Sequence, residues 1–320
     1  MAATPEPRVD RTIWIDGKFV PWQDATVHVL SHSLQRGSLI FDYMSVHETP
    51  RGPAVFRLEE HLERLLTSAE IVGLPLRADV PGLEAAVCET VRRNPGAKAV
   101  KVSAYLPSIE VDVVPLDDRV SVAIAAYDPG ADVVAHKPTK PRLAASVRLW
   151  VEKEVRNRRP DILPPQAKVA ANYASPMLAK WRARRAGYDE IVLVDEDGFV
   201  AEGPTTNIFL VDGDGTVITP PEETVLLGVT RRSILEIADH DGVPLREERV
   251  RPDELAGAAE VFLTGTTAGV WPVESVDGKK IGASAPGPVS LRLRDRFQEI
   301  SNGHDPAFEH WLTFVNPSRG

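Results

Sequence analysis

The sequence predicts an α+β protein of two domains, and three observations support this class. The chain has 320 residues, enough for one large domain or two ordinary ones. In both halves, short apolar runs with the alternation of strands are interleaved with segments of helical period. Between them, DPGADVVAHKPTKP concentrates proline, glycine and lysine, the composition of a connecting loop. We expect a small α+β domain over 1–128 with a loose first ten residues, a linker over 129–141, and a larger β-rich α+β domain over 142–320.

The first domain is expected to open with a β-hairpin. In TIWIDGKFVPW, two alternating runs flank Asp16-Gly17, a strong hairpin signal. Residues 54–75 pass from a short strand into a helix that ends near Gly73. The helix has five apolar residues on one face: Leu58, Leu62, Leu65, Leu66 and Ala69. The valine-rich runs AVKVSAYL and RVSVAIAAY, which begin at Ala99 and Arg119, predict two further strands.

The second domain is expected to be richer in strands. EIVLVDEDGFVAEG and TNIFLVDGDGTVITPP predict strands joined by turns at Asp197-Gly198 and Gly213-Asp214-Gly215. TRRSILEIADHDGVP then predicts a helix, and EVFLTGTTAGVWPV a strand that runs into a loop of glycine and threonine. Small-molecule sites are common in clefts between domains, so we expect the active site in such a cleft.

Composition excludes several functions. A net charge of −9 argues against a general nucleic-acid binder, and the basic runs RNRRP (156–160) and KWRARRAG (180–187) are interpreted as solvated faces. A single cysteine, Cys88, cannot form an intrachain disulfide, which fits a reducing cytoplasm. Neither a secretory leader nor a membrane-spanning run is expected. The common nucleotide-triphosphate, zinc-protease, α/β-hydrolase and dinucleotide motifs are absent from the sequence, and we expect no metal site.

Several features make sense together around an organic phosphate. Lys168 stands among small apolar residues in QAKVAANYASP, where desolvation would lower its pKa and favour Schiff-base chemistry. Gly228-Val229-Thr230 precedes a helix and could offer N–H groups to an anion. Thr264-Gly265-Thr266-Thr267 at a strand end could form a second such cradle. Arg57, directly after a short strand, could add a fixed charge to the phosphate.

Two further residues suggest that the phosphate belongs to a heteroaromatic cofactor. Glu202 lies between two expected strands, where its carboxylate could keep a ring nitrogen protonated. Tyr173 follows Lys168 closely, and its phenol could hydrogen-bond an oxygen on that ring. A lysine nucleophile, an acid for a ring nitrogen, a phenol and phosphate cradles are the groups that pyridoxal 5'-phosphate (PLP) requires.

Six stretches then carry a resemblance to a known family: HVLSHSLQRGSLIFDY, GPAVFRLEEHLERL, AKVAANY, AGYDEIVLVDEDGFVAEGPTTNIFLV, LLGVTRRSILEIA and EVFLTGTTAGVWPVESVDG. In order and spacing they resemble the class IV aminotransferases, the fold-type IV PLP enzymes, and most closely the branched-chain amino acid aminotransferases. The likeness runs from Ile13 to Val276, with a weaker part reaching Trp311.

The resemblance implies roles for single residues. It makes Lys168 the lysine that holds the cofactor covalently and moves the proton, with Glu202 on the ring nitrogen and Tyr173 near the ring oxygen. It assigns the phosphate to four residues: Arg57, Val229, Thr230 and Thr266. It places Thr267 where a backbone N–H meets the substrate carboxylate. It also implies a homodimer with pocket residues from both subunits.

The likeness is weaker around the substrate. Branched-chain enzymes carry Phe-Glu-Gly where this sequence has Phe41-Asp42-Tyr43, so tyrosine adds bulk to the pocket wall. Arg36 stands where that group has tyrosine, and Val102 is the nearest match to an arginine that binds the second carboxylate of glutamate. Lys101 or Arg36 would then have to bind that carboxylate.

We therefore expect an aminotransferase that moves an amino group between a branched-chain amino acid and a 2-oxo acid such as 2-oxoglutarate, by ping-pong kinetics. Three alternatives share the cofactor residues. FDYMSV has some likeness to (R)-selective amine transaminases, and D-amino acid aminotransferases use the same fold. An aminodeoxychorismate lyase would use the same lysine for elimination. A PLP-binding module without catalysis is the third alternative.

Overall fold

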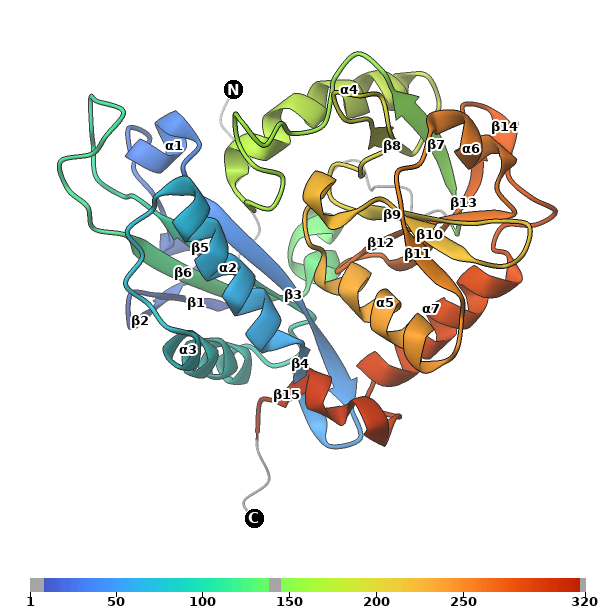
Figure 1. Ribbon diagram of the computed structural model, residues 1–320. Helices are drawn as coiled ribbons and strands as arrows, with labels where there is room; N and C mark the ends of the chain where they lie inside the picture. Colours follow the sequence, from blue (N-terminus) through green and yellow to red (C-terminus); the bar gives the residue numbers. More distant parts are fainter. Residues whose placement is uncertain (1–8, 138–144, 317–320) are drawn as a thin grey trace. The chain divides into compact units, whose positions relative to one another are not determined.

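The structure, a computed structural model, describes residues 9–137 and 145–316. These residues fall into two compact units (Figure 1). Unit 1 comprises residues 9–137 and 302–316, and unit 2 comprises residues 145–301. A seven-stranded sheet forms the centre of unit 1 and an eight-stranded sheet that of unit 2, so each unit combines helices and strands as the α+β class predicts.

The sheet of unit 1 is antiparallel throughout. Its strands lie in the order β15 (Leu312–Phe314), β4 (Gly52–Phe56), β3 (Ile40–Thr49), β5 (Ala99–Tyr105), β6 (Ser121–Tyr127), β1 (Thr12–Ile15) and β2 (Lys18–Pro21). The predicted hairpin is confirmed, because β1 and β2 pair with Ile15 opposite Lys18. Asp16 and Gly17 turn the chain with φ of 47° and 87°, the left-handed geometry that matches strand twist in a two-residue turn.

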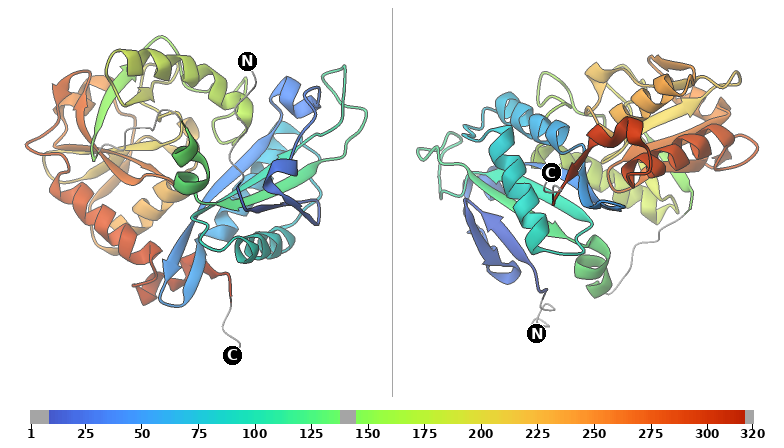
Figure 2. Two further views of the ribbon diagram at one scale, coloured as in Figure 1. Left: turned by 180° about the vertical axis from the view of Figure 1, so that it is seen from behind. Right: turned by 90° about the horizontal axis from the view of Figure 1, so that it is seen from below.

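Two helices cover one face of this sheet and lie side by side (Figure 2). Helix α2 (Leu58–Val72) packs on β3, and α3 (Val80–Arg93) packs on α2, β6 and β1. The helix predicted after residue 54 is therefore confirmed, with four of its five apolar residues buried and Leu66 half-buried. Shorter helical turns are η1 (Trp22–Asp24), α1 (His32–Arg36) and η6 (Pro306–Trp311).

An ion cluster around the fully buried Asp42 ties α2 to β3. Asp42, on the covered face of β3, accepts two hydrogen bonds from the Arg64 guanidinium, at 2.9 and 2.8 Å. His61 Nδ1 lies 2.6 Å from the same carboxylate. Burial alone would raise the pKa of Asp42, but the charges of Arg64 and His61 outweigh it and hold that pKa below 3.8.

Replacing Asp42 with asparagine is expected to lower the free energy of unfolding by about 3 kcal/mol at neutral pH, because Arg64 loses its buried partner. A carboxyl whose pKa is depressed by folding stabilises the fold above its unfolded pKa. The difference in the free energy of unfolding between the parent and Asp42→Asn should therefore shrink as the pH falls below 3.8. Urea unfolding at pH 7 and pH 3 measures both effects, and an equal deficit at the two pH values would contradict this assignment.

The sheet of unit 2 is mixed. Its strands lie in the order β11 (Leu245–Glu247), β10 (Val217–Thr219), β9 (Asn207–Val211), β12 (Glu260–Gly265), β13 (Gly269–Val276), β7 (Val147–Glu152) and β8 (Glu190–Leu193), and β14 (Lys279–Lys280) pairs with β13. Parallel pairing joins β10 to β11, β13 to β7 and β7 to β8. The apolar core of this unit is built on side chains of β7, β9, β12 and β13.

Four helices belong to unit 2. Helix α4 (Ala174–Arg185) packs on β8, whereas α5 (Val229–His240) packs on β12 and on α7 (Pro288–Ser301). Helix α6 (Pro252–Gly257) contacts β13, and η4 (Ala170–Tyr173) and η5 (Glu222–Thr224) are single turns. The predicted strands over 190–219 and the helix that follows are confirmed, with Gly198 and Gly215 in left-handed turns.

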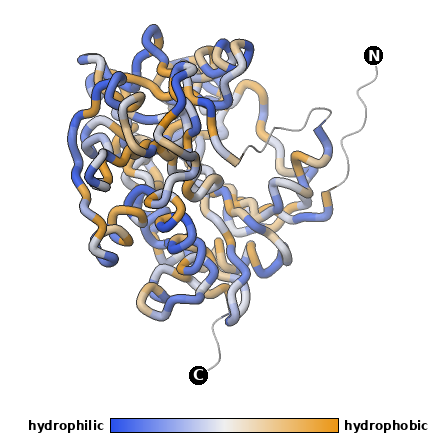
Figure 3. Tube along the Cα trace, turned by 90° about the vertical axis from the view of Figure 1, so that its right-hand side faces the viewer, coloured by the Kyte–Doolittle hydropathy of each residue, from blue (hydrophilic) through white to orange (hydrophobic). Residues whose placement is uncertain are grey.

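Two segments depart from the division expected from the sequence. Residues 302–316 group with unit 1, because β15 pairs with β4 (Leu312 opposite Phe56). Of the expected linker, Pro129–Val133 and Val134–His136 form helical turns within unit 1, and 138–141 lie outside the described residues. Over the described parts of the chain, no helix is long and apolar enough to cross a bilayer, and hydrophilic positions interrupt the hydrophobic ones (Figure 3).

Candidate functional site

Lys168 and Tyr173 meet at the start of η4. The segment before this turn places Lys168 between two buried residues, Ala167 and Val169. The Asn172 side chain donates hydrogen bonds to the carbonyls of Ala167 (3.0 Å) and Pro164 (3.4 Å), which fixes the bend of the chain. Lys168 Nζ consequently lies 3.1 Å from the Tyr173 hydroxyl. An amine and a phenol that the sequence predicted to act together are thus in hydrogen-bond contact.

Glu202 is buried, with 2% of its surface exposed. Its carboxylate accepts hydrogen bonds from Arg158 Nη1 at 2.8 Å, the Leu226 backbone N–H at 3.1 Å and Asn207 Nδ2 at 3.5 Å. Burial raises the pKa of Glu202 above its usual range, and the opposing attraction of Arg158, the Leu226 N–H and Lys168 offsets this only in part. Glu202 is therefore a carboxyl group poised to share a proton with a basic partner.

Arg158 is a residue beside Glu202 that the sequence interpretation missed. The run RNRRP was interpreted as a solvated face, and this is wrong for Arg158, whose side chain is 6% exposed. Its neighbour Asn157 is anchored to unit 2 through hydrogen bonds to the carbonyls of Val194 (2.8 Å) and Thr224 (2.9 Å). That anchor turns Arg158 inward to Glu202. The run of basic letters carries no signal of this, but a buried acid such as Glu202 requires a counter-charge.

Four side chains of unit 2 form one polar cluster: Lys168, Tyr173, Arg158 and Glu202. The Arg158 guanidinium carbon lies 5.2 Å from the centroid of the Tyr173 ring while its Nη1 binds Glu202. Lys168 is close enough for its charge to lower the pKa of Glu202. A nucleophile, a phenol and an acid are therefore assembled from segments that are up to 34 residues apart, as the positions 168, 173 and 202 show.

Asn207 connects this group to the two predicted cradles. Asn207, the first residue of β9, pairs with Thr264 in β12, and Gly228 at the start of α5 lies against the Asn207 side chain. Strands β9 and β12 and helix α5 are labelled in Figure 1. A Cβ at position 228 would lie 2.0 Å from Asn207 Oδ1, so a larger residue there would displace that buried side chain. A Cβ on Gly265 would lie 3.2 Å from the Thr205 carbonyl. The start of α5 and the end of β12 therefore converge next to Glu202.

The residues of the cradles suit an anion. Val229 and Thr230 are buried in the first turn of α5, where backbone N–H groups and the helix dipole attract negative charge. Thr266 is half-buried and Thr267 is exposed at the end of β12. Within the described residues, the buried hydroxyls of Thr206 and Thr264 have no hydrogen-bond partner. These unpartnered hydroxyls, together with the donors of the α5 turn, fit the phosphate and ring of PLP.

Arg57, the predicted cation for the phosphate, lies in unit 1. It follows β4 and begins α2 in a left-handed backbone conformation with φ of 47°. Its side chain is 1% exposed, so the guanidinium is held inside unit 1 and is not a mobile surface group. This burial fits a guanidinium held in one place.

The predicted substrate residues of unit 1 separate into two faces of one sheet. Phe41 and Tyr43 alternate with buried neighbours along β3 and are half-exposed. Register pairs them with Ser103 and Lys101, so these four side chains share one face. The structure places Val102 elsewhere. It is fully buried opposite Asp42 on the helix-covered face, because successive side chains of β5 alternate.

Lys101 is the basic residue that accompanies Phe41 and Tyr43. Its ammonium nitrogen lies 4.5 Å from the centroid of the Phe41 ring, a cation–π contact. Arg36, the other candidate, ends α1 and donates a hydrogen bond to the Val111 carbonyl at 3.0 Å from an exposed position. Of the two cations considered from the sequence, Lys101 shares the face of the predicted pocket wall.

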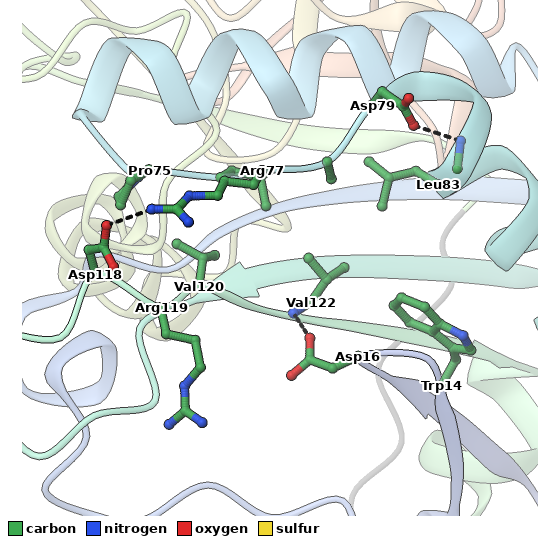
Figure 4. Close-up of a pocket in the computed structure, with 13 residues that line it drawn as sticks. Trp14, Asp16, Pro75, Arg77, Asp79, Leu83, Asp118, Arg119, Val120 and Val122 are labelled. Atoms are coloured by element: carbon green, nitrogen blue, oxygen red, sulfur yellow. Dashed lines mark hydrogen bonds and ion pairs between the residues drawn. The ribbon is translucent and has the colours of Figure 1, made fainter.

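Unit 1 also contains an open cavity of about 760 Å³ that is separate from these residues (Figure 4). It lies between β1, the 75–83 segment and the 118–122 segment. Arg77 and Asp118 form an ion pair at 2.9 Å on its rim, and Asp16 accepts a hydrogen bond from the Val122 N–H. None of the candidate cofactor or substrate residues lines it, so it has no part in the proposed chemistry.

Comparison with known proteins gives a consistent result. The family model for amino-transferase class IV matches residues 39–276. A branched-chain-amino-acid aminotransferase of Pseudomonas aeruginosa is 35% identical over 310 residues, which cover 96% of this chain and 98% of that protein. The crystal structure of a T.th. branched-chain amino acid aminotransferase, complexed with N-(5'-phosphopyridoxyl)-L-glutamate, has a TM-score of 0.87 and 36% identity, covering 97% and 100% of the two chains. That of Thermoproteus uzoniensis with norvaline has a TM-score of 0.87 and 33% identity, covering 96% and 99%.

Proposed function

Because the chain belongs to the class IV aminotransferase family, we propose that it binds PLP on Lys168 and moves an amino group from a branched-chain amino acid to a 2-oxo acid such as 2-oxoglutarate. The contact between Lys168 Nζ and the Tyr173 hydroxyl beside buried Glu202 is the observation that carries the proposal. A chain used only to bind PLP would not need the full set of amine, phenol and acid that Lys168, Tyr173 and Glu202 provide.

Each side chain then has a distinct role. The bound cofactor withdraws electrons from the α-carbon of the substrate. Lys168 Nζ takes the α-proton and returns it one position away, as a general base and then a general acid. Glu202 shares a proton with the ring nitrogen, for which its raised pKa suits it. Tyr173 accepts a hydrogen bond from the Lys168 amine, and its own hydroxyl would donate one to the ring oxygen.

The phosphate is proposed to bind a set of neutral donors and one cation. The N–H groups of Val229 and Thr230, the Thr230 hydroxyl and Thr266 supply neutral donors and the positive end of the α5 dipole. Arg57 supplies the full charge. The backbone N–H of Thr267 is proposed to meet the α-carboxylate of the substrate. Buried Asn207, bonded to both Glu202 and the Leu226 carbonyl, supports the ring end of the site.

The amino donor is inferred from the relatives, which are named for branched-chain amino acids. Phe41 and Tyr43 form an aromatic wall that would contact an aliphatic side chain. Tyr43 is also the observation that favours a second candidate, an (R)-selective amine or D-amino acid transaminase. Its phenol adds bulk to the pocket wall and narrows the pocket at the position where branched-chain enzymes have glycine. An aminodeoxychorismate lyase activity has no comparable support.

The acceptor's second carboxylate is proposed to bind Lys101. Replacing Lys101 with methionine keeps an unbranched side chain of similar length and removes the charge. The kcat/KM for 2-oxoglutarate should fall about tenfold, the range for one charged hydrogen bond, whereas L-leucine should react as before. Lys98→Met, on an exposed lysine before the same strand, is the matched control. Equal losses for both substrates would exclude a specific role of Lys101.

A panel of single half-reactions tests the proposed function. The purified holoenzyme is mixed in turn with L-leucine, L-glutamate, D-alanine and (R)-1-phenylethylamine, and the absorbance change from the aldehyde to the amine form of the cofactor is followed. Reaction with L-leucine and L-glutamate alone supports a branched-chain enzyme. Reaction with the (R)-amine or D-alanine alone would support the second candidate. Borohydride reduction and peptide mapping then show whether the cofactor is on Lys168.

We also propose that the protein acts as a cytoplasmic homodimer. Two segments of unit 1 expose a group of aliphatic side chains: Val27, Val29, Leu30, Leu34, Ile109, Val111, Val113, Val114 and Leu116. The segments are joined by a bridge between Ser31 and Ile109 and by a hydrogen bond from the His32 N–H to the Ser108 carbonyl. Apolar surface of this extent is typical of an interface. Sedimentation equilibrium should give twice the 35.0 kDa mass of one chain.

A further inference from the structure

Trp311 packs against the guanidinium of Arg57 within unit 1. The guanidinium carbon lies 3.7 Å from the centroid of the indole ring, which is a close cation–π contact. The Arg57 backbone N–H also donates a hydrogen bond of 2.6 Å to the Trp311 carbonyl. Arg57 Nη1 forms an ion pair with Glu60 at 3.5 Å. Trp311, in the C-terminal segment, therefore contacts both the backbone and the side chain of Arg57.

The position of Trp311 is itself fixed. It is 3% exposed and packs edge-to-face with Phe56, at 5.8 Å and 88°, and with Phe308, at 4.5 Å and 61°. The next residues form β15, which pairs with β4 so that Leu312 lies opposite Phe56. The strand that ends just before Arg57 is thus hydrogen-bonded to the strand that starts just after Trp311. Sheet pairing sets the distance between the two side chains.

Stacking of this kind has a specific consequence for an arginine. An aromatic face attracts the guanidinium through its charge, whereas an arginine binds two phosphate oxygens through the N–H groups in the plane of that guanidinium, so the two kinds of contact are compatible. A cation–π contact also does not neutralise the charge, as a second carboxylate would. The left-handed backbone at Arg57, an uncommon conformation for a residue with a side chain, further limits the directions the side chain can take.

We propose that Trp311 is a positioning residue for the cofactor phosphate: its indole face holds the Arg57 guanidinium in the orientation that binds this phosphate. The proposal rests on the proposed function, since it takes Arg57 as a phosphate ligand. The C-terminal segment 302–316, which groups with unit 1, would then take part in cofactor binding. Trp311 touches the arginine and not the reacting atoms.

The test compares PLP with pyridoxal, which has the same ring and aldehyde but no phosphate. The dissociation constant of each is measured by titrating the apo-protein and following absorbance, for the unsubstituted protein and for Trp311→Phe and Trp311→Leu. Trp311→Leu should weaken PLP binding about tenfold and leave pyridoxal binding unchanged. Trp311→Phe retains an aromatic face and should show a smaller loss. In an Arg57→Gln background, Trp311→Leu should cause no additional loss.

Controls separate positioning from packing. Trp22→Leu removes another tryptophan of unit 1, one that packs on Tyr127, and should leave the preference for PLP over pyridoxal unchanged. If Trp311 only stabilises unit 1, its variants will unfold at lower urea but bind PLP and pyridoxal with an unchanged ratio, and the inference is then wrong. Failure of borohydride to fix PLP on Lys168 in the unsubstituted protein would instead overturn the proposed function.

Discussion

Replacement of Lys168 with alanine is expected to lower the rate of transamination by about 10³-fold or more. A positioned general base contributes about 10²–10⁴-fold by itself, and Lys168 is also proposed to anchor the cofactor. No other lysine is assigned to the polar group formed with Tyr173, Arg158 and Glu202. The measurement is the rate of the first half-reaction with L-leucine, in single turnover with added PLP. Single turnover separates proton transfer from release of the keto acid.

The matched control is Lys153→Ala, which removes a lysine of the same unit that is 68% exposed. It should react at the parent rate and retain PLP after borohydride reduction, whereas Lys168→Ala should lose the reduced label. If Lys168→Ala transaminated L-leucine at the parent rate, another residue would have to be the base, and the assignment of the whole site would be wrong.

The sequence predicted side chains that the structure brings together where the signal was local. Lys168 and Tyr173 lie five positions apart on one bend, and Gly228 and Gly265 within the two cradles mark close approaches of the chain. Arg158 was missed, because its inward direction depends on the hydrogen bonds of Asn157 to two distant segments. No pattern within RNRRP distinguishes the buried arginine from its exposed neighbours. Burial of a charge is decided by tertiary partners, not by adjacent residues.

The fold shows the same division between local and distant information. The first hairpin and α2 were predicted, because turn geometry and helical period are properties of short segments. The return of β15 to unit 1 was not, since strand pairing over more than 250 positions leaves no trace in either strand. Val102 was assigned to the pocket from its position in the sequence. Its direction, however, depends on the register with Asp42, and the neighbouring Lys101 takes the open face.

Replacement of Glu202 with glutamine is expected to lower transamination about 10²-fold without destabilising the fold. A neutral amide cannot share a proton with the ring nitrogen as a carboxyl group does, so the loss falls within the range for general acid–base catalysis. Unlike Asp42→Asn, Glu202→Gln should not lower the free energy of unfolding. The attraction of Arg64 and His61 exceeds the cost of burying Asp42, whereas burial of Glu202 exceeds the attraction of Arg158.

The sign of the pH dependence follows from that balance. Because the pKa of Glu202 is raised above 4.5 in the folded protein, the folded state binds more protons than the unfolded chain between 4.5 and the folded pKa. The contribution of Glu202 to stability is therefore complete below pH 4.5 and is lost as the pH rises through the folded pKa. Urea unfolding of the apo-protein should show Glu202→Gln equal to the parent at pH 4.5 and at least as stable at pH 8.

A matched variant tests whether Arg158 serves the acid or the fold. Arg158→Met removes the main attraction that lowers the pKa of Glu202, so that pKa should rise further and the rising limb of the kcat/KM profile should shift to higher pH. In Arg158→Met/Glu202→Gln, the pH profile should no longer depend on position 158. If Glu202→Gln were instead less stable than the parent at pH 8 by several times RT, the ion pair would be structural. A buried acid that costs stability at the pH where it works is expected of a catalytic site, because its position is set by the reaction and not by the fold.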